Sequence, residues 1–307
     1  MKAIVFHEYG PASNLRYEDV EDSKPAAGEV LVRVSATCIN PTDWLVRSGA
    51  VKDIIPVEFP YIPGCDLAGT VREVGEGVTS FEPGDHVMAM TLHTYAELCT
   101  VKATDLVKIP AGLEMTTAAT LPLVTLTGNL LLRFCANVQP GQTVLITGAL
   151  GSVGRSAVFA ASEIGARIIA GVRGKRLDAA RQLPGVSEAI AIDDDAEIDK
   201  LGPLDCVADT IGGKLADKLL ARVKQGGTFG CFFSPQDAVR YPTIRISTTF
   251  ERAKTATPAA TTLLHYAEAA RDGKLTIPID RIMPLADAAE AQGAVEKGGI
   301  AKIVLTA

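Results

Sequence analysis

Residues 143–165 constrain the fold most, because a short apolar run, three regularly spaced glycines and an alanine-rich segment follow one another there. The run TVLIT has the β-branched composition of a buried strand. Gly148, Gly151 and Gly154 then recur at every third position, and the alanine-rich segment ends at Gly165, which suits a helix C-cap. We therefore expect a strand, a tight turn and a helix, which together form one arm of a nucleotide-binding βαβ unit.

The glycine turn predicts a phosphate site. A pyrophosphate group can approach backbone N–H groups at the start of a helix only where no Cβ atom intervenes, and glycine lacks that atom. The spacing departs from G-x-G-x-x-G, since two residues separate the first pair of glycines. A glycine-rich turn in an α/β protein that binds no nucleotide is the alternative. The candidate pyrophosphate-binding residues are Gly148, Ala149, Leu150, Gly151, Ser152, Val153 and Gly154.

The residues after the next strand-like run indicate which dinucleotide would bind. The run 167–172 is typical of a buried strand, and Arg173, Lys175 and Arg176 follow it. A site for NADH would need Asp or Glu about 20 residues beyond the glycines, to bind the ribose 2′-hydroxyl. Cations suit a 2′-phosphate instead, since each charge-assisted hydrogen bond contributes about 1.5–3 kcal/mol. The sequence therefore predicts NADPH, with a solvated basic turn as the alternative.

Length, charge and cysteine content limit the class of protein. The chain has 307 residues, of which 47% are hydrophobic, so it can form two domains with large cores. Its net charge of −6 argues against nucleic acid as a partner. The N-terminal apolar run is too short for a signal peptide and no run of 18 apolar residues occurs, so we expect no membrane partner. The six cysteines form no C-x-x-C pair, which favours reduced thiols and a cytoplasmic protein.

The pattern of apolar runs changes near residue 120. Before it, short runs separated by turn signals predict a compact, mostly antiparallel barrel, with a short helix at 41–49. After it, strand-like runs alternate with helical stretches, as in a doubly wound parallel sheet. The predicted strands lie at 2–6, 29–35, 67–74, 86–90, 143–147, 167–172, 189–192, 204–208, 226–233 and 300–305. The predicted longer helices lie at 116–137, 155–164, 257–272 and 285–297.

Further motifs occur in a fixed order along nearly the whole chain. They are Asn40-Pro41-Thr42-Asp43, Pro63-Gly64-Cys65-Asp66-Leu67-Ala68-Gly69, Gly84-Asp85-His86-Val87, Tyr95-Ala96-Glu97, Leu121-Pro122-Leu123 with Leu126-Thr127, Asp209-Thr210-Ile211-Gly212-Gly213 and Ala301-Lys302-Ile303-Val304-Leu305. In this order the motifs resemble the medium-chain dehydrogenase/reductase superfamily. Within it, they resemble the zinc-free NADPH:quinone oxidoreductases related to zeta-crystallin.

The resemblance implies an α/β fold with a GroES-like, mostly antiparallel β-barrel domain and a doubly wound Rossmann domain with a parallel sheet. We place the first part of the GroES-like catalytic domain at 1–119, the NADP-binding Rossmann domain at 120–255 and a return to the catalytic domain at 256–307. The resemblance also implies a homodimer formed by pairing edge strands of two nucleotide domains.

The resemblance further assigns cofactor contacts. It places the nicotinamide near Asn40 and Thr127 and near the segment Phe232, Phe233 and Ser234. It places Thr210 near the pyrophosphate, and Lys302 reaching the cofactor from the last strand. Plain roles in packing, turns or solvation are the alternatives for the phenylalanines, Thr210 and Lys302. Leu150 and Ser152 depart from the small residue and the glycine that are usual in the family.

The ligand positions of the superfamily's zinc enzymes are altered in this chain. Those enzymes bind catalytic zinc through a cysteine just before Thr-Asp, a histidine after Pro-Gly and a later cysteine or histidine. The first two positions are Asn40 and Cys65 here. Catalytic zinc needs three protein ligands, so we expect no metal and interpret Cys65 as a small buried residue.

The predicted reaction is hydride transfer from NADPH to a small, hydrophobic, electron-poor acceptor, either a quinone or an α,β-unsaturated carbonyl compound (enone or enal). Reduction of such an acceptor depends less on a metal ion than the oxidation of an alcohol does. Asn40 would donate hydrogen bonds to the growing charge. Asp43 is either a proton relay or an orienter of the Asn40 loop, Trp44 either roofs the acceptor pocket or packs in the core, and His93 either faces the site or is solvated. The other functions left open are an NADP-dependent alcohol dehydrogenase and a non-catalytic, crystallin-like NADPH-binding protein.

Overall fold

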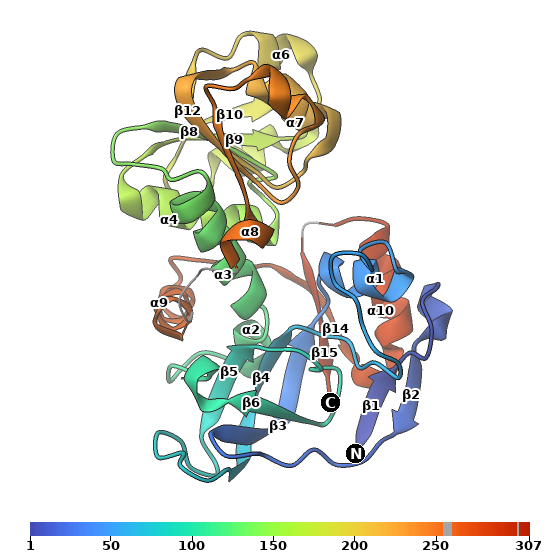
Figure 1. Ribbon diagram of the computed structural model, residues 1–307. Helices are drawn as coiled ribbons and strands as arrows, with labels where there is room; N and C mark the ends of the chain where they lie inside the picture. Colours follow the sequence, from blue (N-terminus) through green and yellow to red (C-terminus); the bar gives the residue numbers. More distant parts are fainter. Residues whose placement is uncertain (254–259, 300) are drawn as a thin grey trace. The chain divides into compact units, whose positions relative to one another are not determined.

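The computed structural model describes residues 1–253, 260–299 and 301–307. The chain divides into two compact units, drawn in Figure 1. Unit 1 comprises Met1–Leu123 and the described residues from Pro258 to Ala307, and unit 2 comprises those of Val124–Thr257. The first unit boundary follows Leu123, four residues beyond the domain boundary expected after residue 119. Helix α2 (Met115–Ala118) precedes both positions and packs against strands of unit 1. The expected second boundary, at 255/256, lies outside the described residues.

Unit 1 is built mainly from antiparallel strands. Its described residues form a seven-stranded sheet in the order β14-β15-β3-β4-β5-β7, with β6 paired to β3, and β1 and β2 form a separate antiparallel pair. Only β14 and β15 run parallel among these described pairs, so the expected mostly antiparallel domain is confirmed. The strands are β1 (Lys2–Val5), β2 (Arg16–Asp19), β3 (Glu29–Cys38), β4 (Asp66–Val74), β5 (His86–Met90), β6 (Leu98–Lys102), β7 (Val107–Lys108), β14 (Ile279–Pro284) and β15 (Lys302–Thr306).

A small apolar cluster of Ala3, Val5 and Ala96 and two larger apolar clusters hold the described residues of unit 1 together. One of the larger two packs α1 (Pro41–Ser48) and α10 (Ala288–Glu296) around residues such as Ile4, Ile39 and Leu305, and the other fills the space between β3, β4, β5 and β6. The pairing of β15 with β3 brings the start of the last strand beside the residues just before α1, since the N–H of Ile39 donates to the carbonyl of Ile303 at 3.0 Å. The remaining helices of unit 1 are η1 (Ala12–Asn14), η2 (Ala103–Asp105), α2, α9 (Ala260–Arg271) and η6 (Leu285–Asp287).

Unit 2 is a doubly wound α/β domain, as predicted. Its described strands form a parallel sheet in the order β10-β9-β8-β11-β12-β13, and the order reverses between β8 and β11. One face of the sheet is covered by α6 and α7, which share an apolar cluster with Leu145 and Phe229, and Figure 1 shows α4 on the other side. The strands are β8 (Thr143–Thr147), β9 (Arg167–Val172), β10 (Val186–Ala191), β11 (Leu204–Asp209), β12 (Val223–Cys231) and β13 (Arg245–Thr248). The helices are η3 (Leu131–Cys135), α4 (Ser152–Ile164), η4 (Gly174–Arg176), α5 (Leu177–Arg181), α6 (Asp195–Asp199), α7 (Gly213–Leu220), η5 (Gln236–Arg240) and α8 (Thr249–Ala253).

The predicted helix at 116–137 is interrupted. The structure divides it into α2, α3 (Pro122–Leu130) and the π-helical η3, because Pro122 has no N–H to continue α2 and instead suits the first position of a new helix. The helix expected at 257–272 is described from Ala260 on, and its first three positions lie outside the described residues.

The segment Met115–Cys135 is long and apolar enough to cross a membrane, judged by length and composition. Within the protein, however, 61% of its apolar window is buried, and core helices of soluble proteins meet the same criterion. The absence of a membrane partner therefore stays a prediction.

Candidate functional site

The glycine turn of unit 2 joins β8 to α4 and requires glycine at two of its three glycine positions. Gly148 has a φ of 61°, in the left-handed region, and a Cβ atom on it would lie 2.4 Å from Oγ1 of Thr210. A Cβ atom on Gly154 would lie 2.1 Å from the carbonyl oxygen of Gly148, so glycine there allows α4 to pack directly on the turn. A Cβ atom on Gly151 would meet only that same oxygen, at 3.1 Å. A side chain at position 151 therefore requires that oxygen to move by only a few tenths of an ångström.

The first turn of α4 offers backbone donors to an anion. The N–H of Arg155 donates to the carbonyl of Gly151 at 2.8 Å, whereas those of Ser152, Val153 and Gly154 have no acceptor among the described residues. Gly151 stands at the N-cap and has no side chain to cap these groups. The helix dipole adds a partial positive charge at the same end. These groups fit the pyrophosphate of a dinucleotide, and no metal is needed to explain them.

The two residues between the first glycines are buried, Ala149 completely and Leu150 to 3% exposure. The carbonyl oxygen of Leu150 accepts a hydrogen bond from Nε of Arg155 at 3.1 Å. The departure from the family pattern at Leu150 is thus accommodated by packing of its side chain inside the protein.

Thr210 lies beside the glycine turn, and a hydrogen-bond network fixes it there. Its Oγ1 donates to the carbonyl of Thr147 at 2.8 Å, and its N–H donates to Oγ1 of Thr147 at 2.9 Å. That hydroxyl in turn donates to Asp209 at 2.6 Å. Burial raises the pKa of Asp209 above its usual value. The network joins the carboxyl ends of β8 and β11, where the strand order reverses and where ligands of such sheets bind.

The predicted cations follow β9. Arg173, Lys175 and Arg176 are exposed, and none of them has an ion pair or a side-chain hydrogen bond within the described part of the chain. Their charges are thus available to a phosphate group. An acidic residue that sequence reasoning missed stands beside them, since Oδ1 of Asp193 accepts the N–H of Gly174 at 2.7 Å. The pairing of β10 with β9 brings Asp193 there, which no local pattern indicates.

The other contacts expected in unit 2 lie on separate elements. Thr127 is half-buried on α3, next to Gly128, where a Cβ atom would lie 2.9 Å from the carbonyl oxygen of Val153. Thr127 therefore stands close to the first turn of α4. Phe232, Phe233 and Ser234 follow β12. Phe233 is 50% exposed and its ring contacts that of Phe250, with 5.6 Å between centroids.

In unit 1, Asn40 lies at the centre of a buried polar cluster. It is fully buried, and its Nδ2 donates to Oδ2 of Asp66 at 2.7 Å and to the carbonyl of Cys38 at 3.4 Å. Its Oδ1 accepts a hydrogen bond from Nζ of Lys302. Both amide hydrogens are therefore engaged within the protein, and none is left for the donor role expected of this residue.

Asp66 is the member of the cluster that sequence reasoning missed as a site residue. Its carboxylate is fully buried and accepts hydrogen bonds from Asn40, from Sγ of Cys38 at 2.8 Å and from the N–H of Leu123 at 2.7 Å. The last bond caps the first turn of α3, where a negative charge is favourable. The available signal was its place inside the Pro63–Gly69 motif.

Lys302 is only 5% exposed and neutralises part of this cluster. Its ammonium group donates to Asn40 and to the carbonyl of Ile39, at 3.4 Å in the second case. Burial alone would lower the pKa of Lys302, but the acidic groups of Cys38, Asp66 and Asp43 raise it overall. The side chain thus points at Asn40, whereas the resemblance implied contact with the cofactor.

Asp43 holds the start of α1. Its Oδ2 accepts the N–H of Asn40 at 2.7 Å and the hydroxyl of Tyr95 at 2.8 Å, and its Oδ1 lies 3.7 Å from Sγ of Cys65. Burial raises the pKa of Asp43 to about 6. Of the two roles left open for Asp43, this geometry favours the orienter of the Asn40 loop. Trp44, the next residue, is half-buried.

The buried cluster does not suit a metal ion. Among the described residues, no three His, Cys, Asp or Glu side chains converge on one point. The thiols of Cys38 and Cys65 donate to Asp66 and Asp43, and burial raises the pKa of both thiols well above its usual value. The ammonium group of Lys302 adds a positive charge to the same cluster. Protonated thiols and a nearby ammonium group both oppose binding of a cation.

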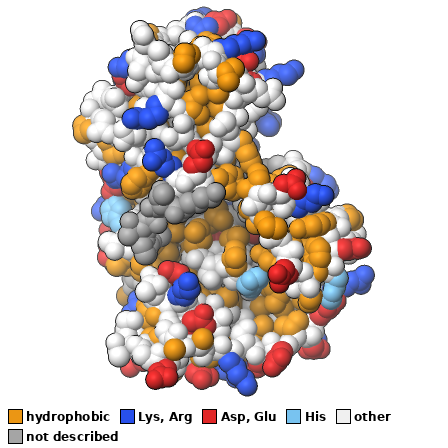
Figure 2. All heavy atoms as spheres, in the orientation of Figure 1, with side chains coloured by type: hydrophobic (Ala, Val, Ile, Leu, Met, Phe, Trp, Pro, Cys, Tyr) orange, Lys and Arg blue, Asp and Glu red, His pale blue; other side chains and the backbone are white. Residues whose placement is uncertain are grey.

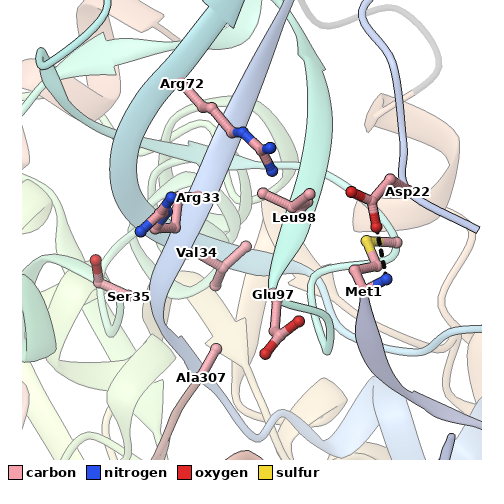
Figure 3. Close-up of a pocket in the computed structure, with 9 residues that line it drawn as sticks. All are labelled: Met1, Asp22, Arg33, Val34, Ser35, Arg72, Glu97, Leu98 and Ala307. Carbon is pink, nitrogen blue, oxygen red and sulfur yellow. Dashed lines mark hydrogen bonds and ion pairs between the residues drawn. The ribbon is translucent and has the colours of Figure 1, made fainter. Parts of the chain in front are cut away.

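A pocket of about 460 Å³ lies elsewhere in unit 1. Figure 3 shows Arg33 and Arg72, from β3 and β4, together with Glu97 and the ion pair of the Met1 amino group with Asp22. No residue of the Asn40 cluster lines it.

Over the face drawn in Figure 2, Lys and Arg side chains are interspersed with Asp and Glu. The absence of a nucleic-acid partner stays a prediction.

Known proteins match both units. Residues 26–112 match the alcohol dehydrogenase GroES-like domain, and residues 185–305 match the zinc-binding dehydrogenase domain. A quinone-oxidoreductase homolog of spinach (Spinacia oleracea) chloroplasts is 32% identical over 200 residues, which cover 62% of this chain and 60% of that protein. The chain thus spans less than two thirds of the length of this relative.

Two further proteins extend the match. An acryloyl-coenzyme A reductase of Metallosphaera sedula is 31% identical over 255 residues, covering 74% of this chain and 75% of that protein. The solved structure of a mycobacterial protein in complex with NADPH covers the whole of both chains, with a TM-score of 0.83 and 25% identity.

Proposed function

Because the chain belongs to the medium-chain dehydrogenase/reductase superfamily, we propose that it is an NADPH-dependent, metal-independent oxidoreductase. It transfers hydride to a quinone or to an α,β-unsaturated carbonyl compound. The names of the chloroplast quinone oxidoreductase and of the acryloyl-coenzyme A reductase support these two acceptor classes. Compounds of both classes are electron-poor and conjugated, so they can delocalise the negative charge that a hydride brings.

The observation that carries the proposal is the combination of donors and charges in unit 2. In the part of the chain that the structure describes, the N–H groups of Ser152, Val153 and Gly154 at the start of α4 have no acceptor, and the side chains of Arg173, Lys175 and Arg176 after β9 have no partner. The first group would hold the pyrophosphate, and the second would hold a 2′-phosphate that NADH lacks. The mycobacterial relative solved with NADPH supports the same cofactor.

The bound dinucleotide would supply the hydride. The residues of unit 2 bind it and hold its phosphates. Those of unit 1 fix local geometry, since Asp43 holds the backbone of Asn40 while Asp66 and Lys302 hold its side chain from two sides. We therefore assign Asn40, Asp43 and Lys302 to positioning, and we keep Trp44 as a residue that contacts the acceptor.

Metal independence rests on the donor set described above. The match of residues 185–305 to a zinc-binding dehydrogenase domain does not change it, because the acidic groups and thiols of the cluster are already engaged with one another and with an ammonium group. No step of the proposed reaction passes through a metal.

NADPH oxidation should be measured against ortho- and para-quinones, enals, enones and haloacrylates, each with and without a chelator. Turnover with one of these classes that survives chelation supports the proposal. Stoichiometric zinc that is lost together with activity contradicts it. Turnover restricted to alcohols with NADP would make the protein an alcohol dehydrogenase, and tight NADPH binding without turnover would make it a non-catalytic binding protein.

We further propose a homodimer, since β13 ends the described sheet of unit 2 and leaves an edge for a second copy. A cytoplasmic location is proposed on the reduced thiols alone. Sedimentation of the purified protein tests the first proposal, and fractionation of cells tests the second.

A further inference from the structure

Arg155 brings a charged side chain to the start of α4. Its N–H donates to the carbonyl of Gly151 at 2.8 Å, so the residue belongs to the first turns of this helix. Helical side chains lean toward the N-terminal end of their helix. The side chain of Arg155 does so, because its Nε donates to the carbonyl oxygen of Leu150 at 3.1 Å. The guanidinium group is therefore held against the glycine turn, by contacts within unit 2 alone.

The guanidinium group has no negatively charged partner in the protein. In the part of the chain that the structure describes, Nε is the only atom of this side chain with a hydrogen bond, and no carboxylate forms an ion pair with it. The two Nη atoms carry four further N–H donors. These donors are free for a ligand.

The position of Arg155 is unfavourable unless an anion binds nearby. The peptide dipoles of a helix place partial positive charge at its N-terminal end, where a cation is repelled. The side chain is half-buried, and burial lowers the pKa of Arg155 without an acidic group that opposes the change. A residue that breaks a local rule in this way is expected at a functional site, where a ligand compensates for the cost.

The free donors of the side chain and of the backbone belong to one short stretch of chain. Leu150, whose carbonyl anchors Nε, stands two residues before Ser152, the first residue of α4. The N–H groups of Ser152, Val153 and Gly154 have no acceptor among the described residues. A pyrophosphate carries two adjacent charged phosphates, so backbone N–H groups can hold one while a guanidinium group holds the other.

We propose that the guanidinium group of Arg155 binds the pyrophosphate of the nicotinamide dinucleotide, together with the N–H groups at the start of α4. The inference rests on the proposed function, which gives this side chain no role. Arg155 and Arg173 then serve different phosphates. Arg155 contacts a group that NADPH and NADH share, whereas Arg173 contacts the 2′-phosphate that only NADPH carries. Arg155 therefore adds affinity for both dinucleotides and does not discriminate between them.

The test uses Arg155→Met, which keeps an unbranched side chain of good helix propensity and removes the charge and the donors. Its dissociation constants are measured for NADPH, for NADH, for ADP and for adenosine 2′-monophosphate. ADP has a pyrophosphate and no 2′-phosphate, and adenosine 2′-monophosphate has the reverse. The constants for NADPH, NADH and ADP should rise about 10- to 100-fold, as when one charge-assisted contact is lost. The constant for adenosine 2′-monophosphate should not change.

Three further variants complete the comparison. Arg173→Ala should show the opposite pattern, with weaker binding of NADPH and adenosine 2′-monophosphate and unchanged binding of NADH and ADP. Arg155→Lys keeps the charge but loses the planar fork, so its constants for NADPH and ADP should lie between those of the wild type and Arg155→Met. Arg167→Met removes a cation from the opposite end of β9 and should change none of the four constants.

The outcomes separate this inference from the proposed function. A wild type that binds neither dinucleotide contradicts the proposed function. A wild type that binds both, together with an Arg155→Met variant that binds NADPH and ADP equally well, overturns only the role of Arg155. Weaker binding of adenosine 2′-monophosphate with unchanged binding of ADP would assign the guanidinium group to the 2′-phosphate and would also overturn it. Should Arg155→Met fail to fold, Arg155→Lys decides the case by the same comparison of ADP with adenosine 2′-monophosphate.

Discussion

Asp43→Asn should make unit 1 more stable at neutral pH and should remove a pH dependence of its unfolding. The carboxyl accepts two hydrogen bonds on one oxygen, from Asn40 and Tyr95, and the oxygen of an amide can accept both. The amide nitrogen would then face the sulfur of Cys65. The substitution therefore keeps the hydrogen bonds from Asn40 and Tyr95, gives up only the long thiol contact of 3.7 Å from Cys65, and removes a buried charge.

The magnitude follows from the pKa of Asp43, which burial raises from 3.8 to about 6. Below about pH 4 the group is protonated in the folded and the unfolded chain, and above about pH 6 it is ionised in both. Between these values the folded chain keeps a proton that the unfolded chain has released, so the free energy of unfolding falls as pH rises. A change of roughly 2 pKa units corresponds to roughly 3 kcal/mol.

The assay is urea unfolding at pH 4, 5, 6 and 7, followed by the fluorescence of Trp44, the only tryptophan and the neighbour of Asp43. The stability of Asp43→Asn relative to the wild type should increase by roughly 3 kcal/mol from the lowest pH to the highest. Other titrating groups are common to both proteins and cancel in the difference. A difference that stays constant over this range would refute the reasoning. Loss of turnover in a stable variant would instead favour the proton relay over the orienter.

The remaining predictions concern the glycine turn, the cations and Asp66. Gly154→Ala should destabilise unit 2, since its Cβ atom would lie 2.1 Å from a backbone oxygen. Gly151→Val should leave the melting temperature nearly unchanged and should abolish NADPH binding. Retained binding in Gly151→Val would show that the turn holds no phosphate. Arg173→Ala should raise the KM for NADPH about 10- to 100-fold and leave kinetics with NADH unchanged. Arg167→Ala is the control, because Arg167 lies at the opposite end of β9 and pairs with Glu188 of β10. It should leave the KM for both cofactors unchanged. Asp66→Asn should lower the free energy of unfolding by about 1–3 kcal/mol, measured by chemical unfolding. Both carboxylate oxygens of Asp66 accept hydrogen bonds, and the nitrogen of an amide cannot accept any. Unchanged stability would mean that the cluster rearranges freely.

The turn at 143–165 could be predicted because its information is local. Apolar composition, glycine spacing and the glycine after the helix all lie within one stretch of chain, and each acts on its own backbone. The doubly wound order of the sheet follows from the alternation of such stretches. The expected cations stand where the end of β9 places them, which is again a local consequence.

The Asn40 cluster could not be predicted in the same way. Asn40 and Asp66 are 26 positions apart, and Asn40 and Lys302 are 262 apart. They meet because β3 pairs with both β4 and β15, and the register of those pairs depends on packing across the whole unit. Sequence reasoning therefore selected Asn40 and Lys302 as candidate site residues without finding the contact between their side chains, and it assigned no role to Asp66.

The most direct measurement of the central claim is a pair of equilibrium titrations of the wild-type protein, one with NADPH and one with NADH, at the same ionic strength. NADPH should bind about 10-fold more tightly than NADH or better, since at least one charge-assisted contact with the 2′-phosphate is added. Equal affinities, or no binding of either dinucleotide, would contradict that claim.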